Sequence, residues 1–193
     1  MLAELNGGGM KGDAMGGFSL IETMIAIGVL AILLAMATPS WQAFIQDARL
    51  TGLRDNLITA LDQARATALA DNNVVTVCPY NPAANNSCGA NWSAGWAVLE
   101  QQGAGQVLLK AQPLTAGGAP TIGSQVTGGS AAIASVSFNP KPPYVAVGQT
   151  GDFRVCDSRG AGSALSFNLQ TSGYVQIATV AGSTLGGAAL SCP

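Results

Sequence analysis

The first residue whose type and position point to chemistry is a single carboxylate in an apolar segment. Glu22 lies near the start of the stretch 18–38, and no polar side chain occurs from Met24 to Ala37. An ionisable group in such a segment is costly to bury and is usually functional. A buried carboxylate needs a charged or hydrogen-bonding partner. The sequence therefore predicts that Glu22 has one.

The second set of reactive side chains is four cysteines, all of which follow the apolar segment. An even number of cysteines in a chain with the features of an exported protein predicts two disulfides. Of the three connectivities we favour Cys78–Cys88, which closes a short loop, and Cys156–Cys192, which ties the last residues to a strand. The alternatives are free thiols in a reducing compartment and a zinc site, and the lack of a CxxC pair argues against zinc.

The composition argues against an enzyme. The chain has no histidine, which removes the commonest general base and the usual partner of a nucleophilic serine or cysteine. Asp152 and Asp157 lie close to Cys156, but alternate residues of a strand point to opposite faces. A turn at 157–160 explains the motif CDSRG. We therefore expect no catalytic residue, no cofactor and no metal.

The overall charge gives no sign of a nucleic-acid binder. Only 9% of the 193 residues are charged, 48% are hydrophobic, and the net charge is −2. About a quarter of the residues are charged in an ordinary soluble domain. The length predicts one domain with an appended segment.

Two helical segments must hold Glu22 and the residues that follow it. The apolar stretch is long enough to span about 30 Å of hydrocarbon as a helix. An amphipathic helix follows over 40–72, and Pro39 between the two halves predicts a kink or local melting. The apolar positions of the second helix recur every three or four residues, which predicts one buried face. These positions are Trp41, Phe44, Ile45, Ala48, Leu53, Leu57, Leu61, Ala64, Ala68 and Leu69.

After residue 73 the sequence pattern changes to short strands separated by turn formers. We expect strands at 74–78, 133–138, 152–156, 164–169 and 173–179, and a hairpin from 95–101 and 106–110. The segment 114–132 is rich in Gly, Ser and Thr and reads as an irregular loop. Trp92 and Trp96 are expected to pack in the core or its loops. The second helix is expected to pack on a small antiparallel sheet system.

The N-terminal motif resembles the class III signal of type IV pilins and type II secretion pseudopilins. The resemblance rests on Gly17, Phe18 and Glu22 and on Pro39, the 22nd residue after the glycine. In that family a membrane prepilin peptidase cuts after the glycine on the cytoplasmic side and methylates the new N-terminal residue. The resemblance implies a leader peptide 1–17, cleavage between Gly17 and Phe18, N-methylation of Phe18, and a transmembrane or filament-core helix 18–39.

The same resemblance implies how Glu22 and Pro39 serve assembly, and where the protein resides. In a filament, Glu22 can pair with the new ammonium group of Phe18, on its own or a neighbouring subunit, and so set axial register. The implied partners are the prepilin peptidase, other major and minor pilins or pseudopilins, and the inner-membrane assembly platform. The protein would cross the inner membrane once, with the globular part 40–193 in the periplasm, before it enters a pilus or pseudopilus.

The start of the leader is a separate question. As numbered, it carries Glu4 and Asp13 against Lys11. A start at Met10 instead of Met1 would give a shorter leader with an early lysine, in line with the positive-inside bias. We hypothesise that translation starts at Met10.

The second half of the chain resembles the GspH/FimT group of minor pilins and pseudopilins. The segments VVTVCP, GWAVL, VSFNP, FRVCDSRG and LSFNLQTSGYVQI and the terminal cysteine carry this resemblance. It implies an α+β, pilin-like fold in which a long N-terminal helix packs on a small antiparallel β-sheet head with disulfides. It implies a minor pilin that helps initiate or cap assembly of a type IV pilus. The alternative with the same architecture is a minor pseudopilin (H type) of a type II secretion system.

A third hypothesis is a DNA-binding minor pilin for natural transformation. Members of the group that bind DNA use arginines in a GRxR-like stretch. The matching stretch here is SGYVQI, where Tyr174 and Gln176 stand in place of the arginines. DNA affinity comes largely from Lys and Arg contacts to phosphates. Arg154 and Arg159, which flank Cys156, are the candidate DNA contacts, and ordinary solvated charges are the simpler interpretation.

Overall fold

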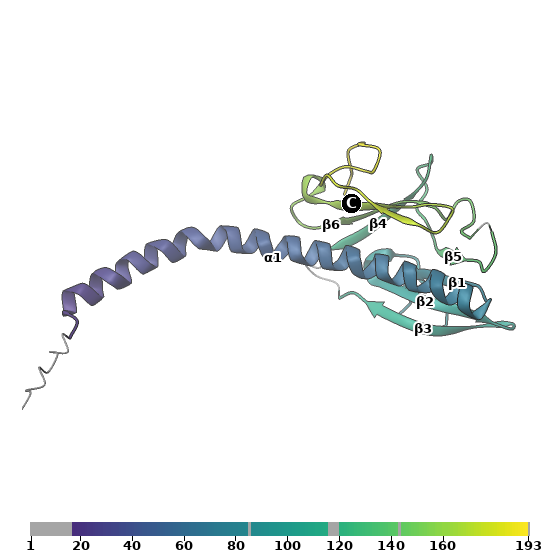
Figure 1. The fold of residues 1–193 in the computed structure, drawn as a ribbon, viewed down its shortest axis with the longest axis horizontal. Helices are drawn as coiled ribbons and strands as arrows, with labels where there is room; N and C mark the ends of the chain where they lie inside the picture. Colours follow the sequence, from purple (N-terminus) through teal and green to yellow (C-terminus); the bar gives the residue numbers. More distant parts are fainter. Residues whose placement is uncertain (1–16, 85, 116–119, 143, 193) are drawn as a thin grey trace, which may run out of the picture. The chain divides into compact units, whose positions relative to one another are not determined.

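The computed structural model describes residues 17–84, 86–115, 120–142 and 144–192, without the side chains of 37–40. The leader positions 1–16, with both candidate start residues Met1 and Met10, lie outside the described residues. So does the side chain of Pro39. The described chain contains one long helix and eight strands (Figure 1). This is the α+β class expected from the sequence.

Helix α1 runs from Leu20 to Asp71. Its backbone is assigned as helical through Pro39, so the local melting expected at this proline is not observed. The helix ends where Asn72 adopts a left-handed conformation with φ of 54°, a common way to terminate a helix. The chain divides into two compact units whose boundary lies within α1, between Ala43 and Phe44.

The head contains two antiparallel sheets of four strands each. The first sheet has the order β3-β2-β1-β5, and the second has the order β4-β6-β7-β8. The strands of the first sheet are β1 (Val75–Pro79), β2 (Gly95–Gln102), β3 (Gly105–Pro113) and β5 (Val136–Phe138). Those of the second are β4 (Thr121–Val126), β6 (Gly151–Cys156), β7 (Leu165–Leu169) and β8 (Val175–Ile177). Two short 3-10 helices, η1 (Trp92–Ala94) and η2 (Ala161–Ser163), complete the head.

Strand β4 corrects the prediction that 114–132 is an irregular loop. It pairs with β6 over its whole length, from Thr121 opposite Cys156 to Val126 opposite Gly151. Its Gly and Ser residues gave little strand signal, and the pairing with β6 stabilises the strand despite its composition. Its outer edge is capped by the hydroxyl of Ser93, which lies 3.3 Å from both the nitrogen and the carbonyl oxygen of Ile122.

Two other strands are shorter than expected, because nearby groups take up their backbone hydrogen bonds. At the start of the predicted strand 133–138, the nitrogen of Ile133 donates to Ser124 Oγ at 3.1 Å, and β5 begins only at Val136. At the start of the predicted strand 173–179, Gly173 has φ of 75° and closes a turn on Gln170. Strand β8 therefore covers only 175–177.

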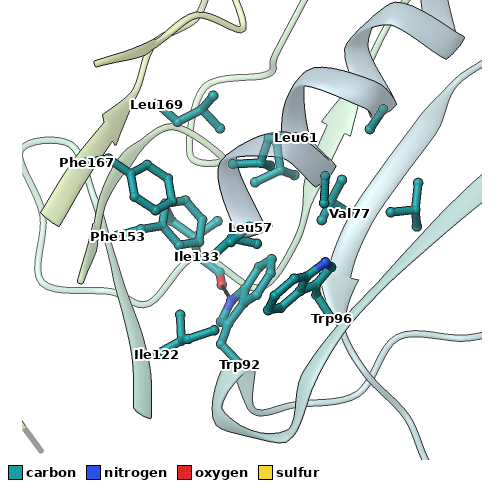
Figure 2. Close-up of a cluster of buried hydrophobic side chains, with 14 of the residues drawn as sticks. Leu57, Leu61, Val77, Trp92, Trp96, Ile122, Ile133, Phe153, Phe167 and Leu169 are labelled. Carbon is teal, nitrogen blue, oxygen red and sulfur yellow. Dashed lines mark hydrogen bonds between the residues drawn. The ribbon is translucent and has the colours of Figure 1, made fainter. Parts of the chain in front are cut away.

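One hydrophobic core joins the second half of α1 to the inner faces of both sheets. Figure 2 shows Leu57 and Leu61 of the helix beside side chains from both sheets. Trp92 and Trp96 are buried in this core, as predicted. The indole nitrogen of Trp92 donates to the carbonyl oxygen of Ile133 at 2.6 Å. The ring of Phe153 lies edge-on to Trp92 and is stacked on Phe167 at 5.1 Å.

The buried face of α1 is shorter than the sequence pattern predicted. The buried positions begin at Leu50 and continue with Leu53, Leu57, Ala60, Leu61, Ala64 and Ala68. Trp41 and Phe44, which were expected on that face, are 65% and 64% exposed. Ala48 and Leu69 are also exposed. Periodicity identifies which face of a helix is apolar, but it does not tell how much of that face the sheets cover.

Candidate functional site

The candidate processing site lies in non-helical chain directly before α1. Gly17, Phe18 and Ser19 carry no regular secondary structure, and all three are exposed. A Cβ built on Gly17 meets nothing within 4 Å among the residues that the structure describes, and Phe18 is 81% exposed. The peptide bond between Gly17 and Phe18 is therefore open to another protein, as proteolytic sites usually are.

Glu22 is the acidic residue in the first turn of α1. A carboxylate in this position interacts favourably with the positive end of the helix dipole. The first turn is closed by the nitrogen of Thr23, which donates to the carbonyl oxygen of Ser19 at 3.1 Å. Glu22 is exposed, so its carboxylate can meet a group from outside the chain.

The first half of α1 presents large apolar side chains on all sides. Each of them is more than half exposed from Leu20 to Met36. They are Leu20, Ile21, Met24, Ile25, Ile27, Val29, Leu30, Ile32, Leu33, Leu34 and Met36. Soluble proteins rarely expose a contiguous apolar surface of this size. By length and composition α1 is able to cross a membrane, and lipid or other apolar helices are surroundings that would suit this surface.

Arg159, one of the two candidate DNA contacts, lies between two carboxylates. Its Nε donates to Asp157 Oδ2 at 2.9 Å, and its Nη1 lies 2.7 Å from Asp47 Oδ1 on α1. Burial alone would raise the pKa of Asp157, but hydrogen bonds from the side chain and backbone of Arg159, and its charge, hold the pKa below the usual range. The pKa of Arg159 is raised mainly by its hydrogen bond to Asp157 and, to a smaller extent, by its hydrogen bond to Asp47. The positive charge of Arg159 is thus balanced by the carboxylates of Asp157 and Asp47.

Arg154, the other candidate, has different surroundings. It lies on β6 opposite Gly123 of β4 and Ser166 of β7. A Cβ built on Gly123 would lie 2.8 Å from Arg154 Nε, so the arginine side chain covers the glycine. Tyr174 is exposed in the turn before β8, and Gln176 lies within β8. The two arginines therefore lie in different surroundings: Arg159 contacts two carboxylates, and Arg154 lies over Gly123.

All four cysteines form the two disulfides favoured from the sequence. Cys78 is bonded to Cys88, with a Cα–Cα distance of 5.5 Å. Cys156 is bonded to Cys192, with a Cα–Cα distance of 5.9 Å. The second disulfide ties the C-terminal segment to the end of β6, and Ser166 Oγ donates to the carbonyl oxygen of Ser183 at 2.7 Å in the same region. Such pairing is typical of proteins that fold in an oxidising compartment.

A polar network at the end of α1 was not anticipated from the sequence. Glu100 of β2 is only 5% exposed. Its two carboxylate oxygens accept from Asn73 Nδ2 at 2.8 Å and from Gln102 Nε2 at 2.9 Å. The hydrogen bonds from Asn73 and then Gln102 hold the pKa of Glu100 below its usual range. The network fixes the end of the helix to the first sheet, and nothing near Asn73 in the sequence indicated Glu100 as its partner.

Two crystal structures of the type IV minor pilin FimU from Pseudomonas aeruginosa (strain PAO1) are similar to this chain. One, in space group P21, is 14% identical, with 69% of this chain and 91% of that chain covered and a TM-score of 0.49. The other, in space group P65, is 14% identical, with 66% and 91% covered and a TM-score of 0.47. This likeness is too distant to assign any role to this chain. The comparison with curated proteins gives no match.

A protein-family model described as type II transport protein GspH matches residues 54–173. The match contains the second half of α1 from Arg54 onward, strands β1 to β7 and the first disulfide. It does not contain Gly17, Phe18 or Glu22, so the N-terminal motif is an independent observation. The family consists of structural pilin and pseudopilin subunits and is not a family of enzymes. Because the match covers more than half of the chain, the protein belongs to the GspH family of minor pilins and pseudopilins.

Proposed function

We propose that the protein is a minor pilin that helps to initiate or cap assembly of a type IV pilus. The observation that carries this proposal is the exposed apolar half of α1, which follows an accessible Gly17–Phe18 bond and has Glu22 in its first turn. The hydrophobic core of the head contains side chains of α1 only from Leu50 onward. The head therefore does not need the first half of the helix for its own core. The exposed half-helix is therefore available for assembly.

Processing by prepilin peptidase comes first in this proposal. The peptidase cuts between Gly17 and Phe18 on the cytoplasmic side, and the new amine of Phe18 is N-methylated. Non-helical, exposed chain on both sides of the bond supports this step. Until assembly, the protein crosses the inner membrane once and holds its head in the periplasm, where both disulfides are stable.

The filament then replaces lipid as the surroundings of the apolar half-helix. The carboxylate of Glu22 and the ammonium group of Phe18, on the same or a neighbouring subunit, enter this apolar interior together. An isolated charge would be costly to bury there, and a paired charge costs much less. The pairing would fix the axial register between subunits. Other major and minor pilins and the inner-membrane assembly platform are the partners this step requires.

A minor pseudopilin of a type II secretion system, of the H type, is the second candidate. The specific observation in its favour is the family description, which names type II transport. The same helix, cleavage and pairing would serve a pseudopilus equally well. The two candidates differ in the machine and not in the chemistry of the chain.

The geometry does not favour a DNA receptor. Arg159 is neutralised by Asp47 and Asp157, and Arg154 lies over Gly123 on the second sheet. Neutralising phosphates needs several free cations on one surface. A purified protein that shifts DNA at low salt, and loses that shift with Arg154→Ala, would restore the DNA hypothesis.

The proposal is tested by following the chain in cells that contain its assembly machinery. Mass spectrometry of the mature protein is expected to find N-methylated Phe18 at the N-terminus. Gly17→Leu is expected to leave only the precursor, whereas Gly28→Leu, a matched change within the helix, is expected to be processed. Deletion of the gene should abolish twitching for a pilin and secretion for a pseudopilin. A mature protein that retains Gly17 and the leader residues before it, and remains functional, would contradict both candidates.

A further inference from the structure

Trp41 differs from the other two tryptophans of the chain. Trp92 and Trp96 are 4% and 1% exposed and lie in the core, whereas Trp41 is 65% exposed on α1. An indole combines a large apolar ring with one N–H donor, so it suits surroundings that are apolar on one side and wet on the other. The structure therefore raises the question of what surrounds Trp41 in the cell.

The position of Trp41 along α1 answers part of this question. The helical rise between Leu20, where α1 begins, and Trp41 amounts to about 32 Å at about 1.5 Å per residue. The hydrocarbon core of a bilayer is about 30 Å thick, and the layer with its headgroups is about 40–45 Å thick. When Leu20 lies at one edge of the hydrocarbon, Trp41 lies at the opposite edge.

The polarity of α1 changes at the same place. Before Trp41 the exposed side chains from Met24 to Met36 are all apolar. Beyond it, the exposed side chains include the charged Asp47 and Arg49. The boundary between a surface that fits hydrocarbon and a surface that fits water thus falls near Trp41. Tryptophan is enriched at this level in membrane proteins.

We infer that Trp41 is an interfacial anchor, whose indole lies among the phospholipid headgroups on the side of the membrane that faces the head. The inference rests on the proposed function, because it requires the first half of α1 to cross a bilayer. The occupant of this surface is the lipid interface of the unassembled subunit. By fixing the depth of α1, Trp41 holds the Gly17–Phe18 bond about one bilayer thickness away, at the opposite surface.

The test measures the depth of Trp41 with brominated lipids, which quench tryptophan at short range. The full chain is reconstituted into vesicles of phosphatidylethanolamine and phosphatidylglycerol whose acyl chains carry bromine either close to the headgroup or close to the bilayer centre. Trp41→Phe gives the emission of Trp92 and Trp96 alone, and subtraction isolates Trp41. We expect shallow bromine to quench Trp41 at least twofold more strongly than deep bromine.

A second variant calibrates the depth scale. In a chain with Trp41→Phe and Ile32→Trp, the new indole lies about 18 Å along the helix from Leu20, close to the bilayer centre. Deep bromine is expected to quench this indole more strongly than shallow bromine. In Trp41→Phe the emission comes from Trp92 and Trp96 alone, and it shows that the head is folded because both lie in its core. Subtracting this emission isolates the new indole at position 32.

The outcomes separate the inference from the proposed function. A chain that floats with vesicles, while Trp41 is quenched most by deep bromine or only by a quencher dissolved in water, overturns the anchor and leaves the membrane helix intact. Quenching of Trp41 by neither lipid, with energy transfer between labelled copies, assigns the surface to a second copy and also overturns the anchor. A chain that does not float with vesicles contradicts the proposed function itself.

Discussion

Arg159 Nη1 lies 2.7 Å from Asp47 Oδ1. This contact joins the loop after β6 to the second half of α1. The same guanidinium bonds to Asp157, whose side chain is only 11% exposed, whereas that of Asp47 is 66% exposed. The two carboxylates therefore do not contribute equally. Among the described residues, Arg159 is the only cation that forms an ion pair with Asp157. Asp47, in contrast, is well solvated.

This difference predicts that replacing Asp47 and replacing Arg159 lower the free energy of unfolding by different amounts. Asp47→Asn is expected to lower the free energy of unfolding by less than about 1 kcal/mol, because exposed ion pairs contribute little. Arg159→Ala is expected to lower it by about 1–3 kcal/mol, because it leaves the nearly buried Asp157 without its donor. Denaturant unfolding of the detergent-solubilised chain with Trp41→Phe, followed by the emission of Trp92 and Trp96, measures both.

Arg49→Ala is the matched control for these two variants. Arg49 is an arginine like Arg159, and it is exposed on α1 close to Asp47. It is expected to change the free energy of unfolding by less than about 0.5 kcal/mol. Equal losses for Arg159→Ala and Arg49→Ala would mean that the cluster does not hold the loop.

The same cluster predicts a loss of stability in acid. The pKa of Asp157 is lower in the folded chain than in the unfolded chain, so its contribution is complete above the unfolded-state pKa of about 3.9. That contribution is lost as the pH falls through the folded-state pKa. Asp157→Asn and Arg159→Ala are each expected to flatten the dependence of the free energy of unfolding on pH below about pH 4. Variants that keep the slope of the unmodified protein would contradict this assignment.

The two disulfides are expected to stabilise the head unequally. Cys156 and Cys192 are 36 positions apart, and Cys78 and Cys88 are 10 apart. Closing the longer loop removes more conformational entropy from the unfolded chain. At 25 °C this difference corresponds to about 1 kcal/mol in the free energy of unfolding. Replacing Cys156 and Cys192 with serine should therefore cost about 1 kcal/mol more than replacing Cys78 and Cys88. Chemical unfolding under oxidising conditions compares the two, and a larger cost for the shorter loop would show that the entropy of the unfolded chain is not what decides.

Features that are local in sequence were predictable for physical reasons. The apolar segment, the helix that follows it and the hairpin of β2 and β3 each depend on side-chain periodicity or turn chemistry within a short stretch. The disulfides could be favoured because each links a strand to a nearby loop or to the chain end. The spacing of Gly17, Phe18 and Glu22 is also a local signal, and the processing that it indicates stays a prediction.

Features that depend on distant partners were not predictable. Strand β4 has few strand-forming residues and exists because β6 lies beside it. Nothing near Asp47 in the sequence indicated Arg159, and nothing near Asn73 indicated Glu100. The exposure of Trp41 was missed because its position fits the apolar face of α1, whereas the burial of that face begins only at Leu50.

The central claim is that Glu22 pairs with the ammonium group of Phe18 inside a filament. The measurement that tests it most directly is the amount of Glu22→Ala protein in sheared filaments, relative to the amount of mature protein in the membrane. Thr23→Ala, in the same helical turn, is the matched control. Removing one partner of a buried ion pair costs several kcal/mol, and about 1.4 kcal/mol is a factor of ten.

We therefore predict that Glu22→Ala is inserted and cleaved normally but is at least tenfold depleted from filaments, whereas Thr23→Ala is incorporated like the unmodified protein. Incorporation of Glu22→Ala at the unmodified level would contradict the account.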